Sequence, residues 1–121
     1  MRAVRILVGD VDDSVAAFEL AGFTVAERWG PAFAILAAGD AHLWISGPET
    51  SAAKLTAQLP PERAADAHVR PVYEVDDLDD AEATLRTEGW VRAAGPITGP
   101  GGSQLLLERR STFLEVFAAR A

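Results

Sequence analysis

In two stretches of the chain, residues 3–8 and 69–75, one set of alternate positions is apolar and the other set includes charged residues, Arg5 in the first stretch and Arg70 and Glu74 in the second. Alternation with a period of two predicts a β-strand whose two faces meet different surroundings. After each stretch, in residues 11–18 and 78–85, apolar residues recur at helical spacing, which predicts a helix with one apolar side. The pattern therefore indicates two strand–helix units, with the apolar face of each strand turned toward a helix.

The two units repeat one sequence pattern. Asp77 lies 67 positions after Asp10, and the same offset relates the glycines that follow the two predicted helices. Asp10 or Asp12 in the first copy, and Asp77 or Asp79 in the second, can accept a hydrogen bond from the free N–H groups of a starting helix. Two copies of one supersecondary unit usually bury a shared face against each other, so we expect two packed modules.

Each unit is followed by further strand and turn signals. The predicted strands span residues 23–28, 32–38 and 41–46 in the first module and 90–94, 103–109 and 112–117 in the second, with a Gly/Pro-rich turn at 95–102. Segment 48–67 is a connector with a short helix within residues 50–59. The sequence thus predicts one α+β domain in which a βαβββ module at 1–47 and another at 68–118 form a cupped mixed sheet.

Composition limits the function. The chain of 121 residues is 49 % hydrophobic and 24 % charged, which suits one domain with its own core. Its net charge of −7 argues against nucleic-acid binding and leaves a cationic ligand open. Without cysteine, the chain has no disulfides, thiolate nucleophiles or zinc–thiolate sites. The sequence shows no export signal and no apolar run of membrane length, so we expect no membrane association and a cytoplasmic location.

The first predicted strand ends in Val-Gly-Asp-Val and its counterpart in Val-Asp-Asp-Leu, and the two helices end in Ala-Gly-Phe and Glu-Gly-Trp. In these motifs and in its doubled modules the chain resembles the vicinal oxygen chelate superfamily, over residues 3–117. That group includes glyoxalase I, extradiol dioxygenases, fosfomycin-modifying enzymes and bleomycin-resistance proteins. The resemblance implies the glyoxalase/bleomycin-resistance fold, but one scaffold hosts several chemistries there, so it implies no single activity.

Metal-dependent members of that superfamily carry a His in the first strand of each module and a Glu in the last strand. The resemblance places Ala3 and Arg70 at the two His positions and Glu115 at the Glu position of the second module. Alanine has no donor atom, and a guanidinium keeps its proton and has no lone pair to give. One carboxylate is too few to hold a catalytic metal, so we expect a protein without a metal or other cofactor.

The strand faces turned away from the helices are expected to line the cup. Charged groups on a concave sheet face are costly unless they meet partners or a ligand, and aromatic side chains there can stack on a planar ligand or attract a cation. Trp29, at a Gly-Pro turn, is one candidate for the wall. The residues predicted to bind the ligand are Arg5, Phe33, Trp44, Arg70, Glu74, Phe113 and Glu115.

The leading hypothesis is a metal-free protein that binds or sequesters a small drug or metabolite, similar to the bleomycin-resistance proteins and thus linked to antibiotic resistance. Its ligand is expected to be planar or cationic. We also expect a homodimer, because one pair of modules leaves an open sheet edge and a half-built cup for a symmetric partner to complete.

Two alternatives stay open. The chain could be a metal-dependent enzyme, a glyoxalase-like lyase or an extradiol-type dioxygenase, with relocated ligands from His42, His68 and Glu115. It could also serve protein–protein contact, with the cup filled by its own side chains. The plainer interpretation of the histidines puts His42 on a solvated hairpin and His68 at the mouth of a strand.

Arg70 most sharply separates this chain from the metal-dependent members of the superfamily that it resembles. We expect it to point into the cup, where its guanidinium cannot shed its charge and needs an acceptor. Glu115 is the expected partner, and Glu74 is the other candidate. If Arg70 reads an anionic ligand instead, its replacement should abolish binding with little change in stability.

Overall fold

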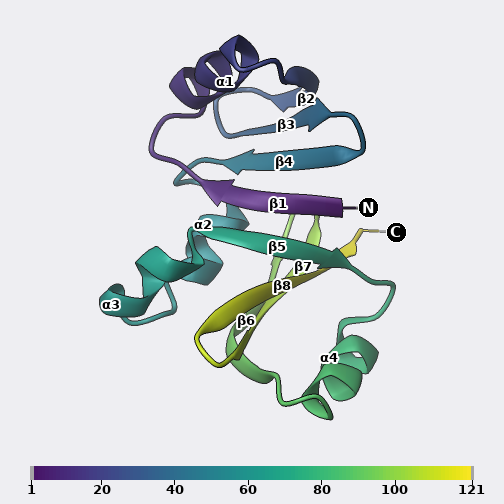
Figure 1. Ribbon diagram of the computed structural model, residues 1–121. Helices are drawn as coiled ribbons and strands as arrows, with labels where there is room; N and C mark the ends of the chain where they lie inside the picture. Colours follow the sequence, from purple (N-terminus) through teal and green to yellow (C-terminus); the bar gives the residue numbers. More distant parts are fainter. Residues whose placement is uncertain (1, 121) are drawn as a thin grey trace.

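The computed structural model describes residues 2–120 of the chain (Figure 1). The first module contains β1 (Arg2–Leu7), α1 (Val11–Leu20), β2 (Thr24–Trp29), β3 (Phe33–Ala38) and β4 (Ala41–Ser46). The second module contains β5 (Val69–Glu74), α4 (Leu78–Arg86), β6 (Val91–Gly99), β7 (Gly102–Arg109) and β8 (Thr112–Ala119). The connector holds two short helices, α2 (Ser51–Thr56) and α3 (Pro61–Ala64), and a 3-10 turn, η1 (Ala65–Ala67). Both βαβββ modules are therefore present in the predicted order.

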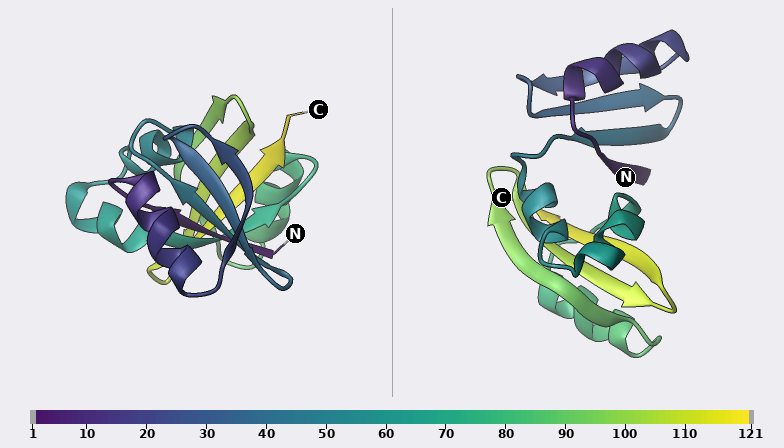
Figure 2. Two further views of the ribbon diagram at one scale, coloured as in Figure 1. Left: turned by 90° about the horizontal axis from the view of Figure 1, so that it is seen from above. Right: turned by 90° about the vertical axis from the view of Figure 1, so that its left-hand side faces the viewer.

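All eight strands form one mixed sheet in the order β2-β3-β4-β1-β5-β8-β7-β6. In each module the first strand runs parallel to the last, and the modules meet where β1 and β5 pair antiparallel, with Arg5 opposite Arg70. Figure 2 shows α1 and α4 at opposite outer ends of the molecule, with the connector helices between them. One chain thus joins both modules in a single sheet.

Both main helices begin at a predicted aspartate. The side chains of Asp10 and Asp77 each accept a hydrogen bond from the backbone N–H three residues later, at 3.1 and 3.0 Å. Gly22 and Gly89, which follow the helices, have φ angles of 103° and 94° that favour glycine. No helix within residues 2–120 combines the length and the hydrophobicity needed to cross a membrane.

The two main helices, α1 and α4, cover the outer parts of one face of the sheet and leave the middle of that face uncovered. Val11 and Val15 of α1 are buried against β3 and β4, and Leu85 of α4 packs against β7 and β8. Val69 and Tyr73 on β5 remain 60 % and 51 % exposed. The expectation that a helix buries the apolar side of this strand is wrong for these two residues, because α4 reaches the later strands of its module.

Strand β6 is longer than predicted. The segment expected as a turn at 95–102 continues as strand to Gly99, and only the next two residues turn the chain. β6 is an edge strand whose pairing with β7 shifts register twice. Such an irregular edge tolerates Gly95 and Pro96, because a proline there need not donate a ladder hydrogen bond.

The connector packs into the second module's part of the cup. Its Leu55 and Leu59 are buried in one cluster with Ala94, Leu106 and Phe113. Gly95 permits this packing, since a Cβ atom there would lie 2.9 Å from Cδ1 of Leu55. The chain's own side chains therefore fill part of the concave face, as the protein–protein contact hypothesis expects, while another part stays open.

The homodimer remains a prediction. Val69 and Tyr73 form an exposed apolar surface on β5, beside its antiparallel counterpart β1, where a second copy would bury them symmetrically. We expect light scattering at micromolar concentration to give the mass of two chains, and Tyr73→Glu to give the mass of one. Leu20→Glu, at a residue 92 % exposed on α1, should leave the mass unchanged. A monomeric wild-type protein would contradict the prediction.

Candidate functional site

Three charged side chains lie buried where the modules meet. Arg5 on β1, Arg70 on β5 and Glu115 on β8 are 4 %, 1 % and 0 % exposed. The strand register puts Arg5 opposite Arg70, and Glu115 lies on the strand next to β5, beside Val72. Strand alternation turns all three side chains toward the concave face. Two guanidinium groups therefore meet one carboxylate in the interior, and we call these three residues the ion cluster.

Glu115 accepts four hydrogen bonds. Its Oε1 accepts from Nε of Arg5 at 3.1 Å and from Nε of Arg70 at 3.0 Å. Its Oε2 accepts from Nη2 of Arg5 at 2.6 Å and from Nε2 of Gln104 at 3.3 Å. The predicted Arg70–Glu115 pair is confirmed, and Arg5 adds a bidentate contact. A carboxylate has about four lone-pair sites, so Glu115 has none left over.

The arginines also hold the segments around them. Arg5 donates from Nη1 to the Ser46 hydroxyl on β4 at 3.1 Å. Arg70 donates to the Thr56 hydroxyl at 2.6 Å and to two carbonyl oxygens of the connector at 2.9 and 3.4 Å. Arg70 therefore ties the connector to the sheet through three oxygen acceptors.

The charges in the ion cluster stabilise one another. Burial alone would raise the pKa of Glu115, but the charges and hydrogen bonds of Arg5 and Arg70 outweigh burial and hold that pKa below its ordinary value. Burial lowers the pKa of Arg70 despite the attraction of Glu115, yet a guanidinium stays protonated at neutral pH. Two positive groups and one negative group leave one net positive charge, and the carbonyl oxygens of the connector face it at Arg70.

A divalent metal does not fit this centre. Ala3 and Arg70 offer no donor lone pair, and the lone pairs of Glu115 are already engaged by protonated side chains. The relocated ligand set of His42, His68 and Glu115 is not brought together. Within residues 2–120, no three His, Asp or Glu side chains gather as a possible metal site.

Both histidines lie away from the open part of the cup. His42 is a half-buried residue of β4 whose Nδ1 has no hydrogen-bond partner, so the expectation of a solvated hairpin position is wrong. The strand starts at Ala41, directly after the turn, which places His42 inside the sheet. His68 is exposed just before β5, where the sequence predicts it.

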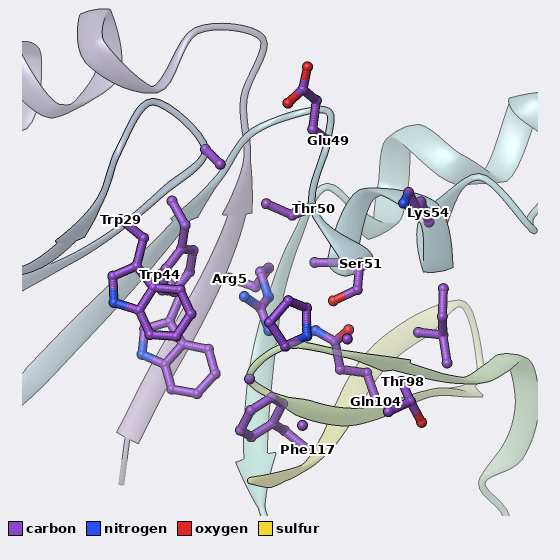
Figure 3. A pocket seen from close by; sticks show the side chains of 18 of the residues that line it. Arg5, Trp29, Trp44, Glu49, Thr50, Ser51, Lys54, Thr98, Gln104 and Phe117 are labelled. Atoms are coloured by element: carbon purple, nitrogen blue, oxygen red, sulfur yellow. The ribbon is translucent and has the colours of Figure 1, made fainter. Parts of the chain in front are cut away.

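A cavity of about 550 Å³ occupies the open part of the cup (Figure 3). Its wall carries four aromatic side chains: Trp29, Phe33, Trp44 and Phe117. Successive rings in this series meet edge to face, with centroids 5.7, 6.4 and 5.2 Å apart. The guanidinium carbon of Arg5 lies 4.9 Å from the Trp44 ring centre. Residues of the connector between 49 and 54, and the β6–β7 turn, also line the cavity.

Three buried polar atoms on this wall have no hydrogen-bond partner among the described residues. They are Nε1 of Trp44, Oε1 of Glu74 and Oε1 of Gln104. The Trp44 and Gln104 side chains are themselves nearly inaccessible, at 5 % and 3 % exposure. An unsatisfied buried polar group costs roughly 1–3 kcal/mol, and an ordered water or a bound molecule would supply the missing partner.

Four of the seven residues predicted to bind the ligand line the cavity: Arg5, Phe33, Trp44 and Glu74. The other three lie under the connector or inside the ion cluster: Arg70, Phe113 and Glu115. Strand alternation puts a residue on a face but does not show where a connector will cover that face. Trp29 lies on the wall as expected. Gln104 and Phe117 are wall residues that the prediction omits, although alternation along β7 and β8 indicates their inward direction.

The comparisons with known proteins agree on the fold. No protein-family model matches the chain, and no curated protein matches it. An NAD-dependent benzaldehyde dehydrogenase from Legionella pneumophila has a similar structure, with a TM-score of 0.75 at 14 % identity over 99 % of this chain and 100 % of that one. The methylmalonyl-CoA epimerase from Mycobacterium tuberculosis gives a TM-score of 0.63 at 16 % identity, over 98 % of this chain and 87 % of that one.

A glyoxalase/bleomycin resistance protein/dioxygenase superfamily member from Vibrio splendidus 12B01 is also similar, with a TM-score of 0.59 at 12 % identity over 99 % of this chain and 98 % of that one. Likeness at such low identity shows the fold alone. The chain has the α+β glyoxalase/bleomycin-resistance fold, with two βαβββ modules in an eight-stranded mixed sheet, as the sequence predicts. The similar structures are mostly of enzymes.

Removing the carboxylate charge should destabilise the fold. Glu115→Gln is expected to lower the free energy of unfolding by about 3–5 kcal/mol, because it leaves two buried guanidinium groups without a counter-charge. Urea unfolding measures the loss. In the control, Glu108→Gln, the affected pair with Arg63 is partly exposed, so the loss should be below about 1 kcal/mol. Equal losses in the two variants would show that the ion cluster does not hold the modules together.

The lowered pKa of Glu115 also predicts an acid limit. A carboxyl group whose pKa is lower in the folded state stabilises the fold fully above its unfolded pKa and loses this contribution as the pH falls through its folded pKa. The ordinary pKa of a glutamate is 4.5, so the stability of the wild-type protein should decline as the pH falls below that value. Unfolding midpoints between about pH 3 and pH 7 should fall less steeply for Glu115→Gln than for the wild type. Parallel curves would contradict the role of Glu115.

Proposed function

We propose that the protein binds a small planar aromatic molecule, a drug or a metabolite, in the cavity beside Trp44, and that it does so without a metal. One observation carries this proposal. Four aromatic side chains surround an open space of about 550 Å³, and three buried polar atoms on the same wall have no partner. Volume, aromatic character and a few converging polar groups are the usual properties of a small-molecule site.

The aromatic wall supports a binding role because it is formed in advance. Apolar rings that face water are unfavourable, and a ligand that covers them gains the free energy of their burial. The edge-to-face contacts from Trp29 to Phe117 fix each ring against the next. A flat ligand could therefore enter without a large ordering cost in the protein.

The wall supports sequestration more strongly than catalysis. Neither histidine lines the cavity, the chain has no cysteine, and the ion cluster has no free lone pair on Glu115. Sequestration needs only shape and affinity. A role like that of the bleomycin-resistance proteins, in which a drug is bound and withheld from its target, is therefore the form of the proposal that we favour. The epimerase and dehydrogenase activities of similar structures belong to those proteins.

A thermal-shift screen tests the proposed function. A ligand that binds only the folded state raises the melting temperature by mass action, so planar aromatic antibiotics should raise it and zinc, nickel or manganese ions should not. Bound compounds should also quench the fluorescence of Trp29 and Trp44. Trp44→Leu should remove the shift, whereas the control Trp90→Phe, in the cluster under α4, should keep it. A shift with metal ions and none with aromatic compounds would refute the proposal.

A further inference from the structure

The unpaired polar atoms of the cavity wall indicate which ligand chemistry it accepts. Gln104 is the clearest case, because its orientation is fixed by a neighbour. Its Nε2 donates to Oε2 of Glu115 at 3.3 Å, and a flipped amide would bring its carbonyl oxygen against that carboxylate instead. Oε1 of Gln104 is therefore held as an acceptor, it is buried, and it has no donor among the described residues.

Glu74 supplies a second acceptor close by. The register of the sheet pairs Glu74 on β5 with Phe117 on β8, and it pairs Phe117 with Gln104 on β7. All three residues line the cavity, so the Phe117 ring is flanked by a carboxylate on one side and an amide oxygen on the other. Oε1 of Glu74 is buried without a partner. The residue as a whole is half-buried, and a cation or an N–H donor would satisfy this unpaired oxygen.

The other charged side chains that line the cavity also favour a positively charged ligand. Two further carboxylates, Glu27 and Glu49, line the cavity, and so does Lys54. Arg5 also lines the cavity and shares Glu115 with Arg70, but the three carboxylates that line the cavity outnumber its two basic side chains. Figure 3 shows Trp29 and Trp44 on one side of the space and Gln104 and Thr98 on the other. Aromatic faces attract cations most strongly where water is excluded.

We infer that the ligand is a planar aromatic cation, a flat ring system that carries a protonated amine or amidine. This inference rests on the proposed function and adds the chemistry of the ligand. The ring system lies against Trp29, which is 53 % exposed, and against Phe117, and its N–H groups donate to the carboxylate of Glu74 and to the amide oxygen of Gln104. The unpaired indole N–H of Trp44 accommodates one neutral acceptor on the same molecule.

Three probes of the same shape and different charge test the inference. At pH 8, 9-aminoacridine is a cation, acridine is neutral and acridine-9-carboxylate is an anion. Titration calorimetry with the wild-type protein should give affinities in that order, with the cation about tenfold tighter than the neutral probe, as one added charge-assisted hydrogen bond provides.

Two variants assign the preference to one residue. Glu74→Gln keeps the shape of the side chain and should weaken 9-aminoacridine about tenfold while leaving acridine unchanged. Glu19→Gln, on the exposed face of α1, makes the same change in net charge outside the cavity and should alter neither affinity. The melting temperature of each variant without a probe shows that it is folded.

The possible failures separate the two proposals. Equal affinities for acridine and 9-aminoacridine, or a Glu74→Gln variant that binds both like the wild type, would overturn the cationic ligand and leave aromatic binding in place. Tightest binding of the carboxylate would also overturn it, and would assign the site to Arg5 and Trp44. Binding of none of the three probes to the wild-type protein would overturn the proposed function and this inference together.

Discussion

The structure depends on one carboxylate that holds two arginines. Each buried charge costs several kcal/mol to remove from water, and two guanidinium groups side by side would repel each other without a counter-ion. Glu115 resolves both problems because all four of its lone-pair sites accept from side chains of β1, β5 and β7. Since Arg70 also binds the connector, both modules and the segment between them share one set of charged hydrogen bonds.

The same interaction limits the chemistry of the cup. In a metal site, carboxylates and imidazoles surround a divalent cation, whereas here the positive charge comes from the protein's own side chains. Arg70 fixes the connector over the second module's part of the concave face, and Leu55 fills the space beneath. Open volume is therefore left beside Trp44, and it has an aromatic wall without a cluster of metal ligands among the described residues.

Local patterns in the sequence predict most of the fold. The repeat predicts both modules, the caps at Asp10 and Asp77 are confirmed, and the contact between Arg70 and Glu115 follows from the need of a buried guanidinium for an acceptor. The site is only partly predictable. Phe113 faces inward as alternation indicates, yet the connector covers it, because tertiary packing and not local pattern decides where such a segment lies.

The ion cluster also shapes the open cavity, although most of it lies outside the wall. Glu115 fixes the guanidinium of Arg5, which lies against the ring of Trp44. Trp44 in turn contacts Phe117 edge to face, so the ion cluster packs directly against the aromatic wall. Gln104 also links the ion cluster to the cavity wall. Its amide nitrogen donates to Glu115, so its amide oxygen is left as an acceptor without a partner among the described residues. The Glu115 carboxylate, whose lone pairs are not available to a metal, thus helps to fix the position of the aromatic rings and makes the amide oxygen of Gln104 a hydrogen-bond acceptor on the cavity wall.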